Sequence, residues 1–198
     1  MKRLCSLVCA IVVLFACTPL FAAGDPGNTP SQYALGDQTM SINAGLFIPL
    51  FLLPTGTVLL AGSPPHLSLG GVGSLSWAAY VAPQIRIGAE IGGSFTFSPN
   101  MNALLMLPII AKASYVFSLY PFEIPVTLGA GVNIISYVDQ HYFDFLLRPG
   151  ASCYYIFNSS WSFGLNLNYW IDMQFSSTAG QSRTGNFLET SLSALYHY

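Results

Sequence analysis

The chain has 198 residues, of which 53% are hydrophobic and only 7% are charged, with six Lys and Arg against eight Asp and Glu. Disordered chains combine low hydrophobicity with high charge, and nucleic-acid-binding proteins carry a basic surface, so the composition excludes both classes. A soluble domain has about 25% charged residues. The low charge therefore indicates a membrane protein, and no nucleic acid is expected as a partner.

The chain begins with the features of an export signal. Residues 1–3 (Met-Lys-Arg) are basic, residues 4–16 are apolar, and residues 22–24 (Ala-Ala-Gly) are small. A basic start, an apolar stretch and small residues before the cut are typical of a secretory signal peptide. We predict a signal peptide over residues 1–24, followed by a periplasmic segment over residues 25–37.

Two alternatives to this cleavage remain open. The first is a retained membrane anchor, although Thr18 and Pro19 interrupt the apolar run, which is shorter than the roughly 20 residues of a spanning helix. The second is lipidation at Cys17, because residues 14–17 resemble a lipobox. Cleavage after residue 24 would leave Cys153 as the one cysteine, so no internal disulfide is expected.

Apolar and polar residues alternate with period two through most of the remaining chain. The pattern is clearest in residues 85–97 and 161–175, where nearly every odd position is apolar and most even positions are small or polar. Successive side chains of a β-strand point to opposite faces, whereas a helix repeats its apolar positions every three or four residues. The uncharged residues 44–62 are long enough for a helix, but Pro49 and Pro54 would break its interior.

The polar face of these strands is rich in Gly, Ser and Asn and carries few charges, which suits a narrow interior better than a surface in water. Transmembrane β-barrels place apolar side chains toward lipid and polar ones inside. We therefore predict an all-β fold, an eight-stranded antiparallel up-and-down transmembrane β-barrel over residues 38–198. The alternative is a soluble β-sandwich, whose outer face would be charged. The predicted strands are residues 38–52, 66–81, 84–98, 103–117, 122–137, 143–157, 161–175 and 186–198.

The connections and the last strand indicate how this barrel would sit in its membrane. Residues 82–83, 118–121 and 158–160 are short connections, as periplasmic turns of outer-membrane barrels are. The last strand ends in alternating apolar residues and the aromatic Tyr198. This pattern resembles the signal that the outer-membrane assembly machinery recognises, so that machinery is an expected partner. The expected location is the bacterial outer membrane.

Several strands resemble the outer membrane protein W family of eight-stranded barrels. Residues 107–117, which begin Leu-Pro, resemble the family's leucine–proline strand ending in Tyr-x-Phe. Residues 125–133 resemble its Pro-x-x-Gly-Ala-Gly-x-Asn strand, with one extra residue, and residues 85–90 and 161–172 resemble two further strands. Order and spacing agree over about residues 40–198. The chain departs from the family in two short outer loops and in ending with Tyr instead of Phe.

Charged residues on the inward face predict a polar network in the lumen. An eight-stranded barrel has an interior that side chains nearly fill. Buried charges are costly unless they are paired, so these residues should form ion pairs. The pairs should narrow the periplasmic part of the lumen and block free passage of water and ions. The predicted members are Arg86, Glu90, Lys112, Arg148, Asp172 and Glu189.

Five other inward residues are apolar and lie nearer the outer end of the predicted barrel. They are Met106, Ile110, Leu146, Trp170 and Phe187. These side chains either line an apolar pocket, which is the common pattern of a ligand site, or simply fill the barrel. In the resembling family, a hydrophobic channel takes up small apolar molecules and releases them sideways into the membrane, and Trp170 is similar to an inward tryptophan of that channel. The resemblance therefore implies passive uptake of small hydrophobic solutes.

Two other functions compete with uptake. A structural or adhesive barrel with a plugged lumen would act through its outer loops, residues 54–65 and 176–185. An enzyme would need a nucleophile beside a base, and no spacing in the sequence places His66, His141 or His197 beside a serine. We expect no catalytic activity, no metal and no cofactor, because no phosphate-binding, metal-ligand or haem motif is present. The expected partners are the lipid bilayer, small hydrophobic solutes and the assembly machinery.

Overall fold

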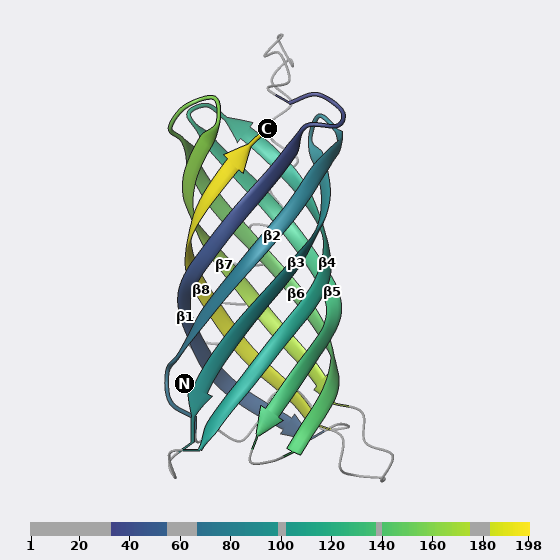
Figure 1. Cartoon of the computed structure of the whole chain (residues 1–198), viewed down its shortest axis with the longest axis vertical. Coiled ribbons are helices and arrows are strands. Elements are labelled where there is room, and N and C mark those ends of the chain that lie inside the picture. The colour runs from purple at the N-terminus through teal and green to yellow at the C-terminus, as the bar shows by residue number, and fades with distance from the viewer. Residues whose placement is uncertain (1–32, 55–66, 99–101, 138–139, 175–182) are drawn as a thin grey trace, which may run out of the picture. The chain divides into compact units, whose positions relative to one another are not determined.

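The computed structural model describes residues 33–54, 67–98, 102–137, 140–174 and 183–198. Each strand pairs antiparallel with its neighbours in the chain, and the first strand also pairs with the last, so the sheet closes into a barrel (Figure 1). The predicted eight-stranded antiparallel barrel is therefore confirmed. Its strands are β1 (Gln38–Pro54), β2 (Gly70–Ala82), β3 (Ile85–Phe97), β4 (Ala103–Leu119), β5 (Phe122–Tyr137), β6 (Gln140–Ile156), β7 (Trp161–Gln174) and β8 (Arg183–His197).

The largest differences from the predicted boundaries lie at one end of the barrel. β2 begins at Gly70, four residues later than predicted, and β6 begins at Gln140, three residues earlier. β8 begins at Arg183, where pairing with the end of β1 extends it through residues without apolar alternation. Pairing with a neighbouring strand is a long-range effect that the local pattern does not contain. The predicted signal peptide, the lipidation alternative at Cys17 and His66 lie outside the described residues.

The two ends of the barrel differ in their connections. β1 begins and β8 ends at the same end, which is uppermost in Figure 1 and is called the terminal end here. At this end only residues 83–84, 120–121 and 157–160 join successive strands. The opposite end is called the loop end, because it carries the longer connections over residues 55–69 and 175–182.

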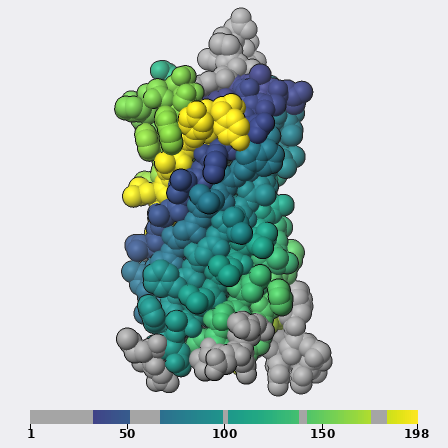
Figure 2. Space-filling view, viewed as in Figure 1, coloured from purple at the N-terminus to yellow at the C-terminus, as the bar shows by residue number. Residues whose placement is uncertain are grey.

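The outward-facing side chains make an apolar surface around the barrel. In the middle of β7, for example, Leu165 and Leu167 are 59% and 54% exposed, while the intervening Asn166 is buried. The wall of neighbouring strands is continuous in the view of Figure 2. A closed sheet satisfies its backbone hydrogen bonds internally, and an apolar outer face suits lipid, so the surface is that of a membrane-spanning barrel. No helix among the described residues is long and apolar enough to cross a membrane.

Aromatic rings gather on the outer face near both ends of the strands. At the terminal end, the ring centres of Tyr115 and Phe117 are 4.8 Å apart and those of Trp161 and Tyr196 are 4.9 Å apart. At the loop end, Phe95 and Phe97 form a similar pair at 6.0 Å. Aromatic girdles of this kind mark the two interfaces of a membrane-spanning barrel.

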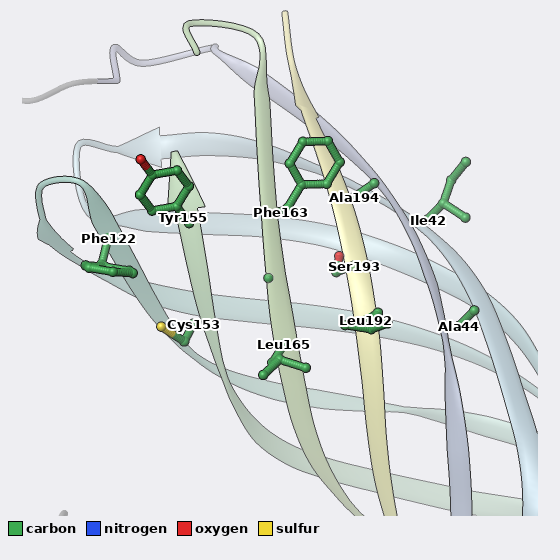
Figure 3. Close-up of a pocket in the computed structure, with 11 residues that line it drawn as sticks. Ile42, Ala44, Phe122, Cys153, Tyr155, Phe163, Leu165, Leu192, Ser193 and Ala194 are labelled. Atoms are coloured by element: carbon green, nitrogen blue, oxygen red, sulfur yellow. The ribbon is translucent and has the colours of Figure 1, made fainter. Parts of the chain in front are cut away.

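One part of the outer face is hollowed near the terminal end. Small residues, including Ala44, Gly164 and Ala194, form its floor, and aromatic rings such as Phe122 and Phe163 stand around it (Figure 3). The depression has a volume of about 660 Å³ and an almost wholly apolar lining. An apolar depression on this face is filled by acyl chains when the barrel lies in a bilayer.

Cys153 lies in this depression and is exposed on the outer face. We expect a lipophilic maleimide to label Cys153 in the folded protein in lipid vesicles, and a charged, membrane-impermeant maleimide to label it much more slowly. The reason is that a charged reagent does not enter the hydrocarbon core of the bilayer. Mass spectrometry of the labelled protein measures both rates.

The matched control for this labelling is Asn158→Cys in a Cys153→Ser background. Asn158 is exposed in the connection between β6 and β7, so both reagents should reach the new thiol from water. Equal labelling of Cys153 by the two maleimides would contradict its placement toward lipid.

Candidate functional site

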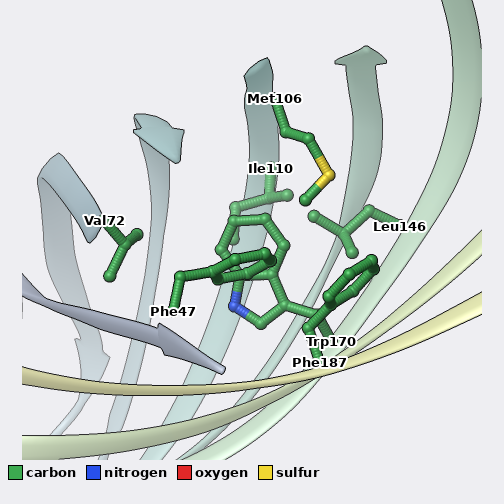
Figure 4. Close-up of a cluster of buried hydrophobic side chains, with 7 residues drawn as sticks. All are labelled: Phe47, Val72, Met106, Ile110, Leu146, Trp170 and Phe187. Carbon is green, nitrogen blue, oxygen red and sulfur yellow. The ribbon is translucent and has the colours of Figure 1, made fainter. Parts of the chain in front are cut away.

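Seven buried hydrophobic side chains fill the lumen toward the loop end and are called the apolar cluster here (Figure 4). They come from six of the eight strands, so the cluster spans the cross-section of the barrel. The ring centre of Phe47 is 5.0 Å from that of Trp170 and 4.8 Å from that of Phe187. Its members are Phe47, Val72, Met106, Ile110, Leu146, Trp170 and Phe187.

The structure brings together all five apolar residues that were predicted to face the lumen. It also adds Phe47 and Val72, which sequence reasoning missed. Phe47 has apolar neighbours on both sides, but counting on from the inward-facing Ser41 and Asn43 places it inward, so a signal was available. Val72 stands between two glycines, but counting back from the outward-facing Trp77 places it inward, so a signal was available. Trp170 and Leu146 are 0% exposed, and every member is at most 8% exposed, so these side chains fill their section of the lumen.

Four charged side chains form a second group across the lumen, called the ion network here. Arg148 on β6 lies at its centre: its guanidinium is 2.5 Å from Glu90 Oε1 on β3 and 3.3 Å from Glu189 Oε2 on β8. Lys112 Nζ on β4 is 3.0 Å from Glu90 Oε2. Two acids and two bases balance in charge, and their side chains are between 2% and 14% exposed.

The remaining two members of the predicted polar network lie apart from the ion network, which corrects the prediction of one connected group. Arg86 lies nearer the terminal end, with its guanidinium carbon 5.8 Å from the ring centre of Tyr80. Arg86 and Glu90 share a face, but four residues of strand separate their positions by about 13 Å at 3.3 Å per residue. Asp172 lies toward the loop end and accepts a hydrogen bond from Asn133 Nδ2 at 2.6 Å. Alternation predicts whether a side chain faces the lumen or the lipid. It does not predict which side chains of other strands lie at the same level along the barrel axis.

Trp170 joins the apolar cluster to the ion network. Its indole Nε1 donates a hydrogen bond to Glu189 Oε2 at 2.8 Å. The guanidinium carbon of Arg148 lies 5.5 Å from the centre of a Trp170 ring, within the range of a cation–π contact. The buried indole N–H is therefore satisfied, and the two groups form one continuous filling of the lumen.

A layer of neutral hydrogen bonds lies between the ion network and the terminal end. Asn166 Nδ2 donates to Asn43 Oδ1 at 3.1 Å and to Ser191 Oγ at 3.2 Å. Tyr154 Oη lies 3.0 Å from Asn166 Oδ1 and 3.1 Å from Ser193 Oγ. Because these buried polar groups satisfy one another across the barrel, the layer holds strands β1, β6, β7 and β8 together.

An aromatic stack closes the terminal end of the lumen. Tyr33, which precedes β1, lies between Tyr80 and His197, with ring-centre distances of 4.5 Å and 5.1 Å. Tyr33 is 7% exposed. Burial, together with a hydrogen bond to Glu123, raises the pKa of Tyr33 above its usual value, so the phenol stays neutral in this position. Tyr33 is thus anchored inside the barrel mouth.

The structure also places a histidine beside a serine, which the sequence spacing did not predict. Ser162 Oγ lies 3.0 Å from His197 Nε2 on the neighbouring strand. Ser162 is 0% exposed, and Tyr33 stacks on the imidazole. His197 Nδ1 has no hydrogen-bond partner among the described residues, so the orienting group of a catalytic triad is not in place there. The side chain of His141 lies outside the described ones.

Comparison with known protein families and sequences gives relatives without an assigned activity. A model of an uncharacterised spirochete family matches residues 23–196. An uncharacterised protein of Borreliella burgdorferi is 25% identical over 165 residues, covering 72% of this chain and 76% of that protein. An uncharacterised protein of Treponema pallidum is 31% identical over 75 residues, covering 37% of this chain and 26% of that protein. The chain thus spans about a quarter of that second relative.

Solved structures show the same fold at low sequence identity. The crystal structure of Neisserial surface protein A superposes with a TM-score of 0.61 at 12% identity, covering 82% of this chain and 97% of that one. The outer membrane protein OprG from Pseudomonas aeruginosa gives a TM-score of 0.50 at 10% identity, covering 85% and 98%. These similarities agree with a barrel that lies in a lipid bilayer.

Proposed function

The chain belongs to the uncharacterised spirochete family whose model matches residues 23–196. From the structure of its lumen, we propose that it is an outer-membrane barrel closed to water and ions. Such a protein acts as a structural or adhesive surface barrel through its loop end. The observation that carries the proposal is the continuous filling of the lumen, in which the apolar cluster packs directly against a charge-balanced ion network.

The connections of the barrel support an orientation with the terminal end in the periplasm. The short turns, the start of β1 and the end of β8 lie at that end, as in other single-chain outer-membrane barrels. In this orientation residues 1–24 are the export signal, residues 25–37 lie on the periplasmic side and the last strand is the part that the assembly machinery recognises. The connections over residues 55–69 and 175–182 then face outward, where loops on a rigid scaffold commonly carry binding functions.

Water or an ion could cross this lumen only by separating groups that satisfy one another. The ion network would lose pairs that are almost fully buried, and an unpaired buried charge is costly. The apolar cluster offers little to a passing ion, because Trp170 Nε1 already donates to Glu189 and Met106 Sδ already lies 3.5 Å from Asn133 Nδ2. The arrangement therefore favours a closed barrel over an open pore.

Conductance in planar lipid bilayers tests this proposal. We expect the purified protein to give no single-channel currents above the lipid background. The matched variant combines Trp170→Ala, Arg148→Ala and Glu189→Ala, which removes the filling where the two groups meet and leaves the Glu90–Lys112 pair intact. This variant should conduct. Steady currents from the unmodified protein, equal to those of the variant, would overturn the closed-lumen proposal.

A second candidate function is passive uptake of small hydrophobic solutes. It is favoured by the position of the apolar cluster, which occupies the loop-end part of the lumen, and by the resemblance to the outer membrane protein W family. Entry requires the cluster to repack around a solute, with Met106 as its most adaptable side chain. Lipid vesicles containing the protein should then admit an apolar fluorescent probe faster than vesicles containing Trp170→Arg. Equal rates would exclude uptake through the cluster.

A further inference from the structure

Three buried oxygen-bearing side chains meet inside the lumen at the loop end. They are Asn133 on β5, Asp144 on β6 and Asp172 on β7, which are 0%, 6% and 3% exposed. Asn133 and Asp144 are direct partners across the β5–β6 pairing. Asn133 Nδ2 also donates to Asp172 Oδ2 at 2.6 Å. The amide therefore contacts one carboxylate directly and lies beside the other across the strand pairing.

Each of these side chains leaves one oxygen without a hydrogen bond. Asn133 Oδ1, Asp144 Oδ1 and Asp172 Oδ1 have no partner among the described residues. Three buried acceptors in one place, and no donor to satisfy them, form an unfavourable arrangement for the protein alone. The unsatisfied amide oxygen is an observation independent of the two acids, because a neutral amide has no charge repulsion to relieve.

No basic side chain of the described chain compensates the two aspartates. The three ion pairs found there join Glu90 and Glu189 to Arg148 and Lys112, and include neither aspartate. Arg183 is exposed at the start of β8 and takes part in none of them. The loop end of the lumen thus carries two buried acids, whereas the neighbouring ion network is neutral by itself.

We propose that Asp144, Asp172 and Asn133 bind a divalent cation of the calcium class. All three proposed ligands are oxygens, which hard cations prefer, whereas zinc and copper prefer nitrogen and sulfur ligands. Calcium accepts six to eight oxygens in irregular geometry, with water at the remaining positions, whereas magnesium requires a nearly ideal octahedron. Two carboxylates neutralise the charge of one divalent ion.

The cation would lie directly over the apolar cluster. Asp144 is one inward position closer to the loop end than Leu146 on β6, and Asp172 is one inward position closer than Trp170 on β7. Asn133 Nδ2 also lies 3.5 Å from Met106 Sδ. The bound ion would join β5, β6 and β7 at the loop end of the apolar cluster. No metal-ligand spacing appears in the sequence, because the proposed ligands lie on three strands and one of them is an amide.

Calorimetric titration of the chelator-treated, folded protein with calcium chloride in a zwitterionic detergent tests this proposal. We expect saturable binding with a Kd of about 10⁻⁴–10⁻³ M, the range of extracellular calcium modules. Asp144→Asn and Asp172→Asn should each weaken binding about tenfold or more, because affinity follows the number of charged ligands. The matched control is Glu123→Gln, which removes a buried acid at the terminal end and should bind as the unmodified protein does.

Asn133→Asp keeps the test decisive if the neutral variants fail to fold. A third carboxylate should tighten calcium binding and make the melting temperature rise more steeply with calcium than that of the unmodified protein. If the protein has no cation site, Asn133→Asp only adds another unpaired buried acid, and calcium should leave the melting temperature of the variant unchanged. No saturable binding, or equal binding by the unmodified protein and both Asp→Asn variants, would overturn the site. The result is independent of whether the lumen conducts.

Discussion

Replacement of Arg148 by Met is expected to lower the free energy of unfolding by about 3–5 kcal/mol, the usual cost of removing one partner from a buried ion pair. Methionine fills much of the space of the arginine stem but cannot pair with a carboxylate. Glu189 would lose its ionic partner, and Glu90 would keep Lys112 alone. Reversible urea unfolding in lipid vesicles, followed by tryptophan fluorescence, measures the change.

A second variant separates the charge effect from the loss of packing. Combining Arg148→Met with Glu189→Gln removes the unpaired acid, and the amide oxygen of the new glutamine can still accept the hydrogen bond from Trp170 Nε1. Most of the lost stability should therefore return. The Glu90–Lys112 pair stays intact in this double variant. If Arg148→Met is as stable as the unmodified protein, Arg148 does not compensate the two glutamates in the folded barrel.

Leu167→Arg is expected to lower the free energy of unfolding in lipid by about 2–4 kcal/mol, as arginine does on the lipid face at the bilayer midplane. Leu167 faces outward in the middle of β7 and is 54% exposed. Leu119 is a matched control, because it is 61% exposed at the terminal end of β4. Near the interface the same change should cost only about 0–1 kcal/mol. Equal costs in vesicle unfolding would contradict the assigned depths.

Asn166→Arg is not a mild comparison for this experiment, although side-chain facing alone would make it one. Asn166 faces the lumen, but it is 7% exposed and hydrogen-bonded to Asn43 and Ser191. An arginine there would break those bonds and overpack a filled interior. The loss in free energy of unfolding caused by Asn166→Arg therefore measures the packing of the lumen and not contact with lipid.

The wall of the barrel was predictable from the sequence, whereas the grouping of side chains within it was not. Alternation gives the facing of residues such as Glu90 and Leu167 because the period of a strand is fixed. The height of a side chain depends on strand tilt and on pairing between strands, and these are set by closure of the whole sheet. For this reason the predicted polar network included Arg86 and Asp172, although they lie apart from the ion network.

Pairing between strands also explains contacts that the alternation pattern did not predict. Alternation gives Phe47 the inward facing of Ser41 and Asn43, but its partners in the apolar cluster depend on the register with β2 and β8. Ser162 and His197 are 35 residues apart, and they meet because β7 pairs with β8. Contacts of this kind are properties of the sheet and not of either segment alone.

The place of Tyr33 between Tyr80 and His197 has a consequence for where the folding unit starts. A chain cut at residue 38 would retain every strand, yet it would expose two ring faces and the carboxylate of Glu123 to water at the mouth. The smallest self-sufficient barrel therefore starts at Tyr33. A domain fused directly before Tyr33 would therefore be attached at a residue that is buried inside the barrel mouth.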